Sequence, residues 1–449
     1  MAVGRLSLSI LAFATSVTPA LAQMGGTPIL PSEGFLRSPQ QQNAAPPAAN
    51  VGRIDASEPT YDETIFTRID RALLSYSAIA AHGGWPTLPK DAKLAGGVSG
   101  PEVALLRRRL ALTGDLDSTV QNGEAYDAGL VAAVKRFQAR HGLTETGSVG
   151  PLTLTALNVP VEVRLRQLTG SRERLTGTNF IFGQRYVVVN IPAATVEAIA
   201  DGKVERRHVA VVGKPERPSP TLTTTIRAIN LNPTWTVPLS IVKKDIVPKM
   251  RKDPTYLARM HMRLLDASGN EISPSTVDWH AERTPGVTIR QDSGTWNSLG
   301  AVRIDMPNPH SVYLHDTSQK NLFNSDVRFH SSGCARVENP RDLAAWLLQD
   351  NEGWGRREID AGIATGERRD IRLPRPVPVA WIYLTGWSTH DGTVHFRPDI
   401  YGHDEAPVKP FMVSQPRPII TAAQASGFVL QSGESRPARI QDVSWLDSQ

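Results

Sequence analysis

The stretch that decides the fold is Tyr186-Val187-Val188-Val189-Asn190-Ile191-Pro192, a β-branched run that ends at a turn residue. β-Branched side chains favour extended backbone, so this run predicts a buried strand. Runs with a similar strand signal recur at 208–212, 223–231, 301–306, 311–315, 376–384 and 393–396. We therefore expect residues 180–405 to form one mostly β domain with a few helices.

Two stretches depart from this strand pattern. Residues 243–295 are more polar and carry a helical pattern at Pro254–Leu265, which predicts a mixed α/β insertion between strands. Asn232–Pro238 contains two prolines, which cannot donate to a sheet ladder, so this stretch cannot lie in a central strand. Further on, Asp342–Leu348 is predicted to be a helix with its apolar residues turned inward.

Helical periodicity dominates the chain before residue 180. Apolar residues recur at helical spacing in 62–81, within an expected helical scaffold at 59–98. Two more helices, each with one apolar stripe, are expected in a compact module at 99–160. The stripes consist of Val103, Leu106 and Leu110, and of Leu130, Val134 and Phe137. The predicted fold class is thus α+β and multidomain, with a helical module beside the mostly β domain.

The two ends of the chain have compositions of their own. Residues 1–22 combine Arg5, a short apolar run and the cleavage pattern Ala20-Leu21-Ala22, as in a secretory signal peptide. The apolar run is too short to span a bilayer, which takes about 20 residues, and no later stretch reaches that length. We expect export to the periplasm without a stable membrane anchor, a disordered linker at 23–58 and a flexible tail at 406–449.

The composition argues against several classes of function. With 49 Lys+Arg against 44 Asp+Glu the net charge is +5, and the charges form no long runs, so nothing indicates nucleic-acid binding. The sequence has no H-E-x-x-H pattern and no phosphate-binding loop, and one cysteine cannot build a Cys₄ zinc site. We expect no metal and no cofactor. The single cysteine, Cys334, is either an inert buried thiol or a reactive one.

The neighbours of Cys334 favour the reactive alternative. A thiol nucleophile needs a base, and His315 ends a strand in the segment Val312–Thr317, from which its ring could reach the sulfur. It also needs N–H donors for an oxyanion, and Gly333 leaves the backbone beside Cys334 unobstructed. Tyr313 lies two residues before His315, on the same strand face, and its hydroxyl is a candidate second donor.

Arg336, two residues beyond Cys334, completes the candidate site. Its guanidinium can clamp a substrate carboxylate. The alternative is a structural ion pair with Glu338 or Asp342.

These motifs resemble those of the L,D-transpeptidases of the YkuD type, where a strand with a histidine precedes the sequence S-x-G-C-x-R. Here Cys334 follows His315 by 19 positions. The segments that match the large periplasmic subgroup of this family are Asn232–Pro238, Tyr313–Thr317, Ser331–Pro340, Gly392 and Asp399–Gly402. Ser332 departs from smaller family members, which have a histidine before the glycine. His330 lies close to Cys334 in sequence, but His315 occupies the catalytic position of the family.

The resemblance implies a mechanism. Cys334 would attack meso-diaminopimelate in a tetrapeptide stem, D-Ala would leave, and an amine of another stem would take the acyl group, with His315 as acid and base. Gly333 would supply the oxyanion hole. The implied substrate-binding residues are Arg336, Ser332, Asn232 and Trp235. The insertion at 243–295 resembles the mobile lid of the family.

The helical module at 99–160 carries a second resemblance. Its sequence from Val134 to Thr153 is similar to the peptidoglycan-binding module of cell-wall enzymes. The same residues would also build a three-helix core, so binding and scaffolding both remain open. The expected partners are peptidoglycan stem peptides, or wall-attached proteins.

Three functions follow from these resemblances. The leading one is cross-linking of peptidoglycan. The same chemistry could instead attach a protein to the wall, or hydrolyse and trim stem peptides. From a different class, the chain could be a non-catalytic wall-binding protein.

Overall fold

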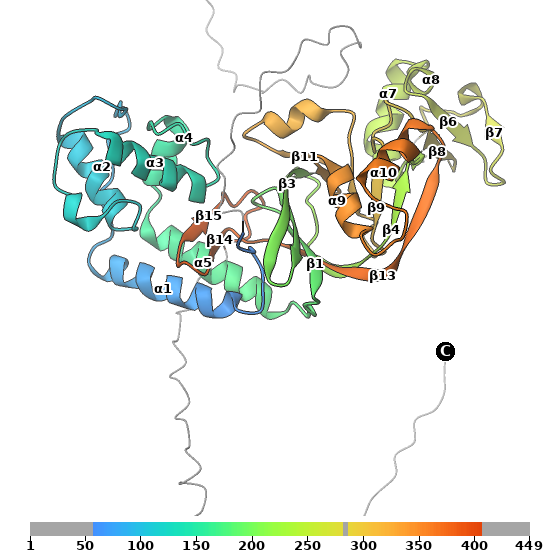
Figure 1. Cartoon of the computed structure of the whole chain (residues 1–449). Helices are drawn as coiled ribbons and strands as arrows, with labels where there is room; N and C mark the ends of the chain where they lie inside the picture. The colour runs from blue at the N-terminus through green and yellow to red at the C-terminus, as the bar shows by residue number, and fades with distance from the viewer. Residues whose placement is uncertain (1–56, 282–285, 406–449) are drawn as a thin grey trace, which may run out of the picture. The chain divides into compact units, whose positions relative to one another are not determined.

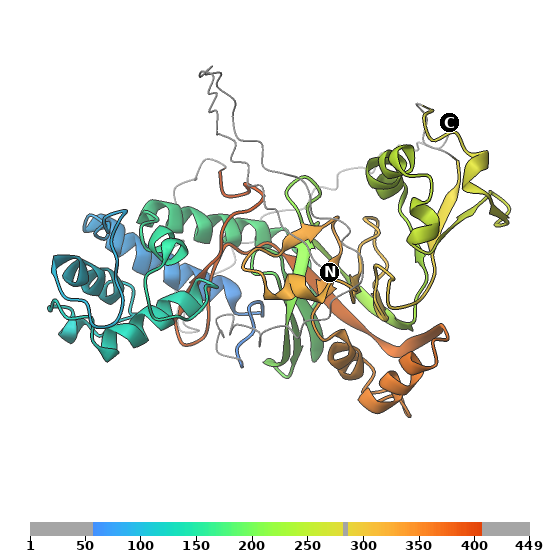
Figure 2. The same ribbon diagram turned by 90° about the horizontal axis from the view of Figure 1, so that it is seen from above.

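The computed structural model describes residues 57–281 and 286–405, which Figures 1 and 2 show from two directions. The predictions for residues 1–22, 23–56 and 406–449 lie outside these ranges. No helix within them is long and apolar enough to cross a membrane. The domain limits expected from the sequence remain a proposal.

A nine-stranded sheet organises the second half of the described chain. Its strand order is β11-β3-β12-β10-β9-β4-β13-β1-β2, and β2 also pairs with β3, so the sheet closes on itself. The strands are β1 (Arg185–Asn190), β2 (Thr195–Ala200), β3 (Lys203–Gly213), β4 (Leu222–Leu231), β9 (Val302–Asp305), β10 (Leu314–His315), β11 (Phe329–Ser331), β12 (Ala335–Val337) and β13 (Arg369–Ile382).

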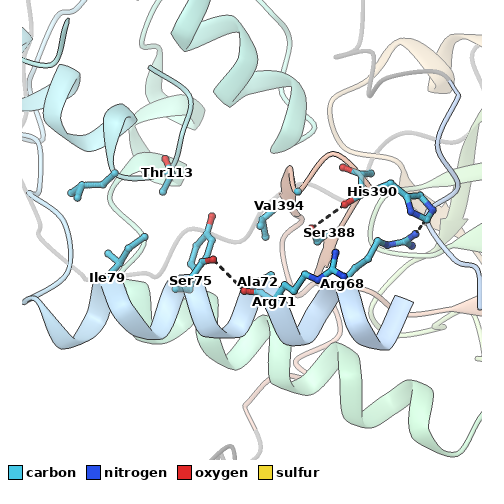
Figure 3. A pocket seen from close by; sticks show the side chains of 13 residues that line it. Arg68, Arg71, Ala72, Ser75, Ile79, Thr113, Ser388, His390 and Val394 are labelled. Atoms are coloured by element: carbon cyan, nitrogen blue, oxygen red, sulfur yellow. Dashed lines mark hydrogen bonds between the residues drawn. The ribbon is translucent and has the colours of Figure 1, made fainter. Parts of the chain in front are cut away.

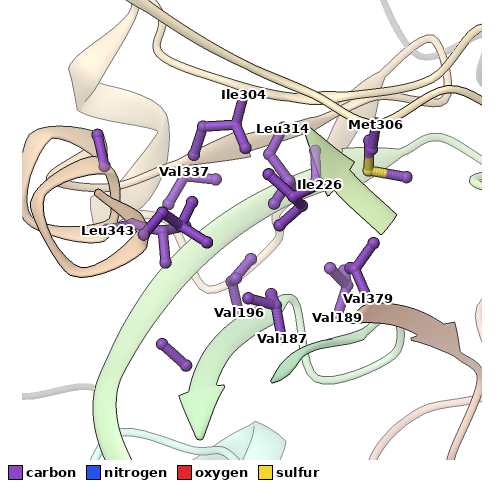
Figure 4. Close-up of a cluster of buried hydrophobic side chains, with 14 of the residues drawn as sticks. Val187, Val189, Val196, Ile226, Ile304, Met306, Leu314, Val337, Leu343 and Val379 are labelled. Atoms are coloured by element: carbon purple, nitrogen blue, oxygen red, sulfur yellow. The ribbon is translucent and has the colours of Figure 1, made fainter. Parts of the chain in front are cut away.

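Strand β1 is buried on both faces, which explains its continuous β-branched sequence. Val187 and Val189 point into the main core of the sheet, which Figure 4 shows in close-up. Tyr186 and Val188 point to the other side, into a second core shared with two helices. The predicted strands at 186–192, 208–212 and 223–231 are confirmed.

The strand expected at 311–315 is shorter than predicted and begins at Leu314. Ser311 has a φ of 55°, and the Asn308 side-chain amide donates to the carbonyl of Val312 at 2.7 Å. These residues therefore form a turn before the strand. The expected strand at 393–396 is β15 (Val394–Phe396), which pairs with β14 (Gly386–Ser388) in a separate hairpin.

Helices fill the described chain before the sheet, as predicted for 62–81 and the module at 99–160, and α1 lies beside α5, a helix that was not predicted, in Figure 1. These two helices cover the second face of the strand pair β1–β2, whereas α2, α3 and α4 share a core of their own. Their bounds are α1 (Ile65–Ala81), α2 (Pro101–Ala111), α3 (Ala128–Arg140), α4 (Pro151–Leu157) and α5 (Val161–Thr176). The predicted helix at 342–348 is α9 (Pro340–Leu347), followed by α10 (Arg356–Ala364).

An inserted lobe, residues 235–281 and 286–291, has its own core and its own four-stranded sheet, β5-β8-β6-β7. The proline-flanked β5 lies at an edge of that sheet, as its two prolines require. Its elements are β5 (Trp235–Thr236), α6 (Leu239–Ile241), α7 (Val247–Lys252), α8 (Tyr256–Arg259), β6 (Met262–Leu265), β7 (Glu271–Ile272) and β8 (Thr288–Gln291).

The helix predicted over 254–265 is wrong in its second half. Helix α8 ends at Arg259, and His261 then takes a φ of 52°. The residues that follow pair with β7 and β8 as β6. Tertiary pairing therefore overrides the helical pattern here.

Candidate functional site

The pairing of β10 with β12 brings the predicted site residues onto one sheet face. The two strands run parallel, with Leu314 opposite Ala335 and His315 opposite Arg336. Leu314 and Ala335 are fully buried in the main core. Since side chains alternate along a strand, Tyr313, His315, Cys334 and Arg336 belong to the opposite face.

The backbone around Cys334 is held in a tight turn between β11 and β12. Gly333 has a φ of 119°, which side-chain-bearing residues rarely adopt. Ser331 Oγ accepts from the Gly333 N–H at 3.1 Å and donates to the Cys334 carbonyl at 2.5 Å. Ser219 Oγ donates to the Gly333 carbonyl at 2.7 Å. Within the described ranges, the N–H of Cys334 donates to no acceptor, so it is free to serve a ligand oxygen.

His315 is buried, with 6% of its surface exposed, and its Nδ1 has no hydrogen-bond partner in the described chain. Its ring lies edge-on to the ring of Tyr313, with 5.6 Å between the centroids. Burial lowers the pKa of His315 to about 3, and the positive charges of Arg336 and Arg303 act in the same direction. The imidazole is therefore neutral at pH 7 and able to accept a proton.

The thiol of Cys334 is also held in its neutral form. Burial raises its pKa to about 11, although hydrogen bonds from the backbone and side chain of Tyr313 act against the shift. The resting site thus holds a neutral thiol and a neutral imidazole rather than a thiolate and an imidazolium. Proton transfer from the sulfur must then accompany its attack on a substrate.

Arg336 is available to a ligand anion. Its Nη1 donates to the Gln319 side-chain oxygen at 2.7 Å, and no carboxylate among residues 57–281 and 286–405 lies within ion-pair distance. Asp342, considered as its partner, pairs with Arg356 instead. The ion-pair alternative for Arg336 is therefore wrong.

Asp316, next to His315, is a structural anchor. Its carboxylate accepts from the N–H groups of Ala301 at 3.0 Å and Thr317 at 2.8 Å, and it pairs with Lys320. Gly300 makes this arrangement possible, because a Cβ there would lie 2.4 Å from Asp316 Cγ. Its φ of 59° also favours glycine.

Replacing Gly300 by alanine is expected to destabilise the protein by about 2–4 kcal/mol, because backbone strain and overpacking add. Gly269→Ala is the matched control, since Gly269 has a φ of 86° but a Cβ there meets nothing within 4 Å. Thermal unfolding of both variants measures the difference. Equal losses of stability would show that the Asp316 contact is not what requires glycine at 300.

The surroundings differ among the other residues that were expected to bind substrate, which are Asn232, Trp235 and Ser332. Asn232 is buried and its amide donates to the carbonyls of Gly362, Ile363 and Glu367 at 3.3, 3.1 and 3.0 Å. These hydrogen bonds are structural, so Asn232 is no longer a candidate for substrate binding. Trp235 packs against the core of the inserted lobe, and its role in substrate binding stays a prediction.

Ser332 links the nucleophile turn to the inserted lobe. Its hydroxyl accepts from Arg217 Nη1 at 3.0 Å. The same guanidinium makes a bidentate ion pair with Asp245 of the inserted lobe, with one Nη2–Oδ1 distance of 2.9 Å. Arg217 thus bridges the lobe and the turn that carries Cys334.

The sequence analysis missed several residues of this site, and most of them have no local signal in the sequence. Arg303 lies opposite His315 on β9 and stacks over the Tyr313 ring at 4.6 Å. Its place in an alternating strand could have revealed it. Ser219, Arg217 and Asp245 lie in a loop and a lobe far away in sequence, and nothing local marks them.

His330 is exposed and contacts the Val327 carbonyl at 2.9 Å.

The comparisons with known proteins agree with the fold class. Residues 184–377 match the YkuD family model, described as "L,D-transpeptidase catalytic domain", and residues 99–157 match a model described as "Putative peptidoglycan binding domain". The chain therefore carries an L,D-transpeptidase catalytic domain and a domain of the peptidoglycan-binding type. The α+β multidomain fold class expected from the sequence is confirmed.

A curated relative and several solved structures carry related names. A protein of Haemophilus influenzae named "Putative L,D-transpeptidase" is 32% identical over 219 residues, which are 49% of this chain and 44% of the relative. The chain thus matches less than half the length of that relative. An L,D-transpeptidase structure from Mycobacterium smegmatis is 17% identical, covering 44% of this chain and 58% of that one, with a TM-score of 0.23. An L,D-transpeptidase structure from Xylanimonas cellulosilytica is 17% identical, covering 66% of this chain and 98% of that one, with a TM-score of 0.19.

Proposed function

We propose that this chain is a periplasmic L,D-transpeptidase that cross-links peptidoglycan through a thioester on Cys334. The observation that carries the proposal is the single sheet face with Tyr313, His315, Cys334 and Arg336, inside a segment that matches the L,D-transpeptidase catalytic domain. The substrate is the tetrapeptide stem whose third residue is meso-diaminopimelate.

In the first step Cys334 Sγ attacks the carbonyl of diaminopimelate. The S–C bond forms as His315 takes the thiol proton, and the C–N bond to D-Ala breaks as His315 returns that proton to the leaving amine. The free N–H of Cys334 is placed to stabilise the oxyanion, and the Tyr313 hydroxyl is a candidate second donor.

In the second step the side-chain amine of another diaminopimelate attacks the thioester. The N–C bond forms, the C–S bond breaks, and His315 carries the amine proton to the departing sulfur. The product is a peptide bond between two third-position residues. The neutral state of His315 at pH 7 suits both steps, because the imidazole must accept a proton before it donates one.

Arg336 is proposed to bind a carboxylate of the donor stem. Arg336→Ala is expected to raise KM for a tetrapeptide substrate at least about tenfold, the worth of a charge-assisted hydrogen bond. Because its partner Gln319 is neutral, the substitution strands no buried carboxylate and thermal stability should be kept. Steady-state kinetics measure the effect, and an unchanged KM would contradict the clamp role.

The Arg217–Asp245 pair is proposed to hold the inserted lobe against the nucleophile turn while the donor binds. Arg217→Ala and Asp245→Ala are each expected to slow acylation about five- to tenfold, and the double variant no further, because one interaction is lost in all three. The control is Asp253→Ala, which breaks the Arg259–Asp253 pair within the lobe. Independent, additive losses would show that the pair does not act as a unit.

The proposed activity is tested with peptidoglycan digested by a muramidase after incubation with the protein. Dimers linked between two diaminopimelate residues are the expected product. Shortened stems without dimers would show hydrolysis, and stems carrying a foreign peptide would show protein attachment. Unchanged muropeptides with protein retained on the sacculi would favour a wall-binding role alone.

A further inference from the structure

A polar pocket of about 250 Å³ lies away from the residues proposed for catalysis. Helix α1, the end of α2 and the β14–β15 hairpin form its walls, and Figure 3 shows the side chains that line it. None of Tyr313, His315, Cys334 or Arg336 is among them. The polar lining residues on which the argument rests are Arg68, Arg71, Ser75, Tyr76, Thr113 and His390.

Arg68 leaves one edge of its guanidinium without a partner. Only 3% of its surface is exposed. Nη1 donates to Asp62 at 2.6 Å and to Thr64 at 3.1 Å, and it lies 2.8 Å from His390 Nε2. Nε and Nη2 are buried and have no acceptor in the described part of the chain. That edge has the geometry that binds a carboxylate through two parallel hydrogen bonds.

Two buried arginines without a carboxylate partner also lie near Tyr76, one of the lining residues. Arg140 lies near Tyr76 and pairs with Asp115 at 2.5 Å. Arg109 and Arg164 are buried beside it, but their hydrogen bonds go to carbonyl, hydroxyl and amide oxygens. Neither has a carboxylate within ion-pair distance among residues 57–281 and 286–405. Such buried charge is costly, and a nearby anion would offset part of the cost.

The mouth of the pocket offers accessible donors. Arg71 is exposed and, within the described residues, forms no ion pair. Ser75 is exposed one turn further along α1 and donates to the Arg71 carbonyl at 3.2 Å. Figure 3 shows both side chains on the same side of the helix as Arg68. The pocket therefore combines Arg71 and the open edge of Arg68, whose charge Asp62 balances, with hydroxyl groups, and such donors can hold a carboxylate.

We infer that this pocket binds a carboxylate-bearing part of a peptidoglycan stem peptide, as a second contact with the wall outside the catalytic groove. The inference rests on the proposed function for its substrate class. Thr113, one of the lining residues, belongs to the segment that matches the peptidoglycan-binding model. The volume suits a group of one or two amino-acid residues, because whole drug-sized ligands occupy about 300–1,000 Å³.

Hydrogen exchange measured by mass spectrometry tests the inference on the full chain carrying Cys334→Ala. The probe is a soluble disaccharide tetrapeptide released from peptidoglycan. It is expected to protect α1 and residues 386–396 as well as residues 312–336 of the catalytic site. Arg71→Glu and Ser75→Trp should raise the concentration for half-protection of α1 at least tenfold and leave 312–336 unchanged. Arg108→Glu, an exposed α2 residue outside the pocket, is the matched control.

Two further arms identify the chemistry. A probe with amidated carboxyl groups should lose the protection of α1, and retained protection would overturn the inference. Inorganic phosphate at the same concentration should give no protection, and equal protection would mean a general anion site. A failure of the pocket can be told apart from a failure of the proposed function, because a carbapenem adduct on Cys334 in an Arg71→Glu protein that keeps Cys334 reports catalysis alone. If the unmodified probe leaves α1 unprotected, the inference is wrong.

Discussion

Replacing Cys334 by serine is expected to lower the transpeptidase rate about 10⁴-fold or more, because loss of a nucleophile removes the whole covalent route. The fold should be unchanged, since the turn is held by Gly333, Ser331 and Ser219 rather than by the thiol. Formation of the cross-linked dimer over time measures the rate, and thermal unfolding checks the fold.

Ser332→Ala is the matched control for this substitution. It alters the neighbouring residue and removes one hydrogen bond to Arg217, so a loss of less than about tenfold is expected. A Cys334→Ser protein that kept more than a few per cent of the rate would contradict the nucleophile role. So would a Ser332→Ala protein that lost as much as Cys334→Ser.

Replacing His315 by glutamine is expected to lower the acylation rate about 10²–10⁴-fold, the usual contribution of a general base. The buried, neutral imidazole also sets the pH dependence. Because its pKa lies near 3, the acylation rate of the native protein should show no limb near pH 6.5. Between the two pKa values the native rate should stay level, because neutral His315 takes the thiol proton during the attack, and it should rise further only as the thiol itself ionises.

The rate at which iodoacetamide alkylates Cys334 measures whether the resting thiol is protonated. The pKa of the thiol is raised to about 11, so alkylation should be slow at pH 7 and increase through pH 9 and above. Cys334 is the single cysteine of the chain, so the modified residue is unambiguous. An inflection below pH 7 that disappears in His315→Gln would instead show a preformed thiolate–imidazolium pair.

Strand alternation made much of the candidate site predictable. Tyr313 and His315 are two residues apart, and so are Cys334 and Arg336, so each pair had to share a face. What the sequence could not supply was the register that places the two pairs together, Leu314 opposite Ala335. That register depends on the closed sheet, which only the fold reveals.

The errors have local causes. Asn232 was expected to bind substrate, but it has a φ of 46° and ties its amide to carbonyls at the end of α10. The stretch 254–265 was expected to be one helix, because its spacing cannot show that residues 262–265 pair with β8. Both errors arise where a long-range contact decides the role of a residue.

The hydrogen bonds that hold the nucleophile turn could not be predicted from the sequence for the same reason. Tyr401 donates to the Gly213 carbonyl at 2.6 Å and accepts from the Ser219 N–H at 3.1 Å, and Ser219 in turn holds Gly333. The sequence Asp399–Gly402 belongs to the motifs that resemble the family, but its physical role depends on contacts that only the fold reveals. The pocket beside α1 likewise joins three segments that no local pattern connects.

The central claim is that Cys334 forms a covalent acyl-enzyme. Its most direct test is the intact mass of the protein after incubation with a carbapenem, which acylates L,D-transpeptidases in place of the donor stem. The account predicts one adduct per chain on the native protein, located on Cys334, and none on Cys334→Ala. A native protein without an adduct, or an equal adduct on both proteins, would contradict it.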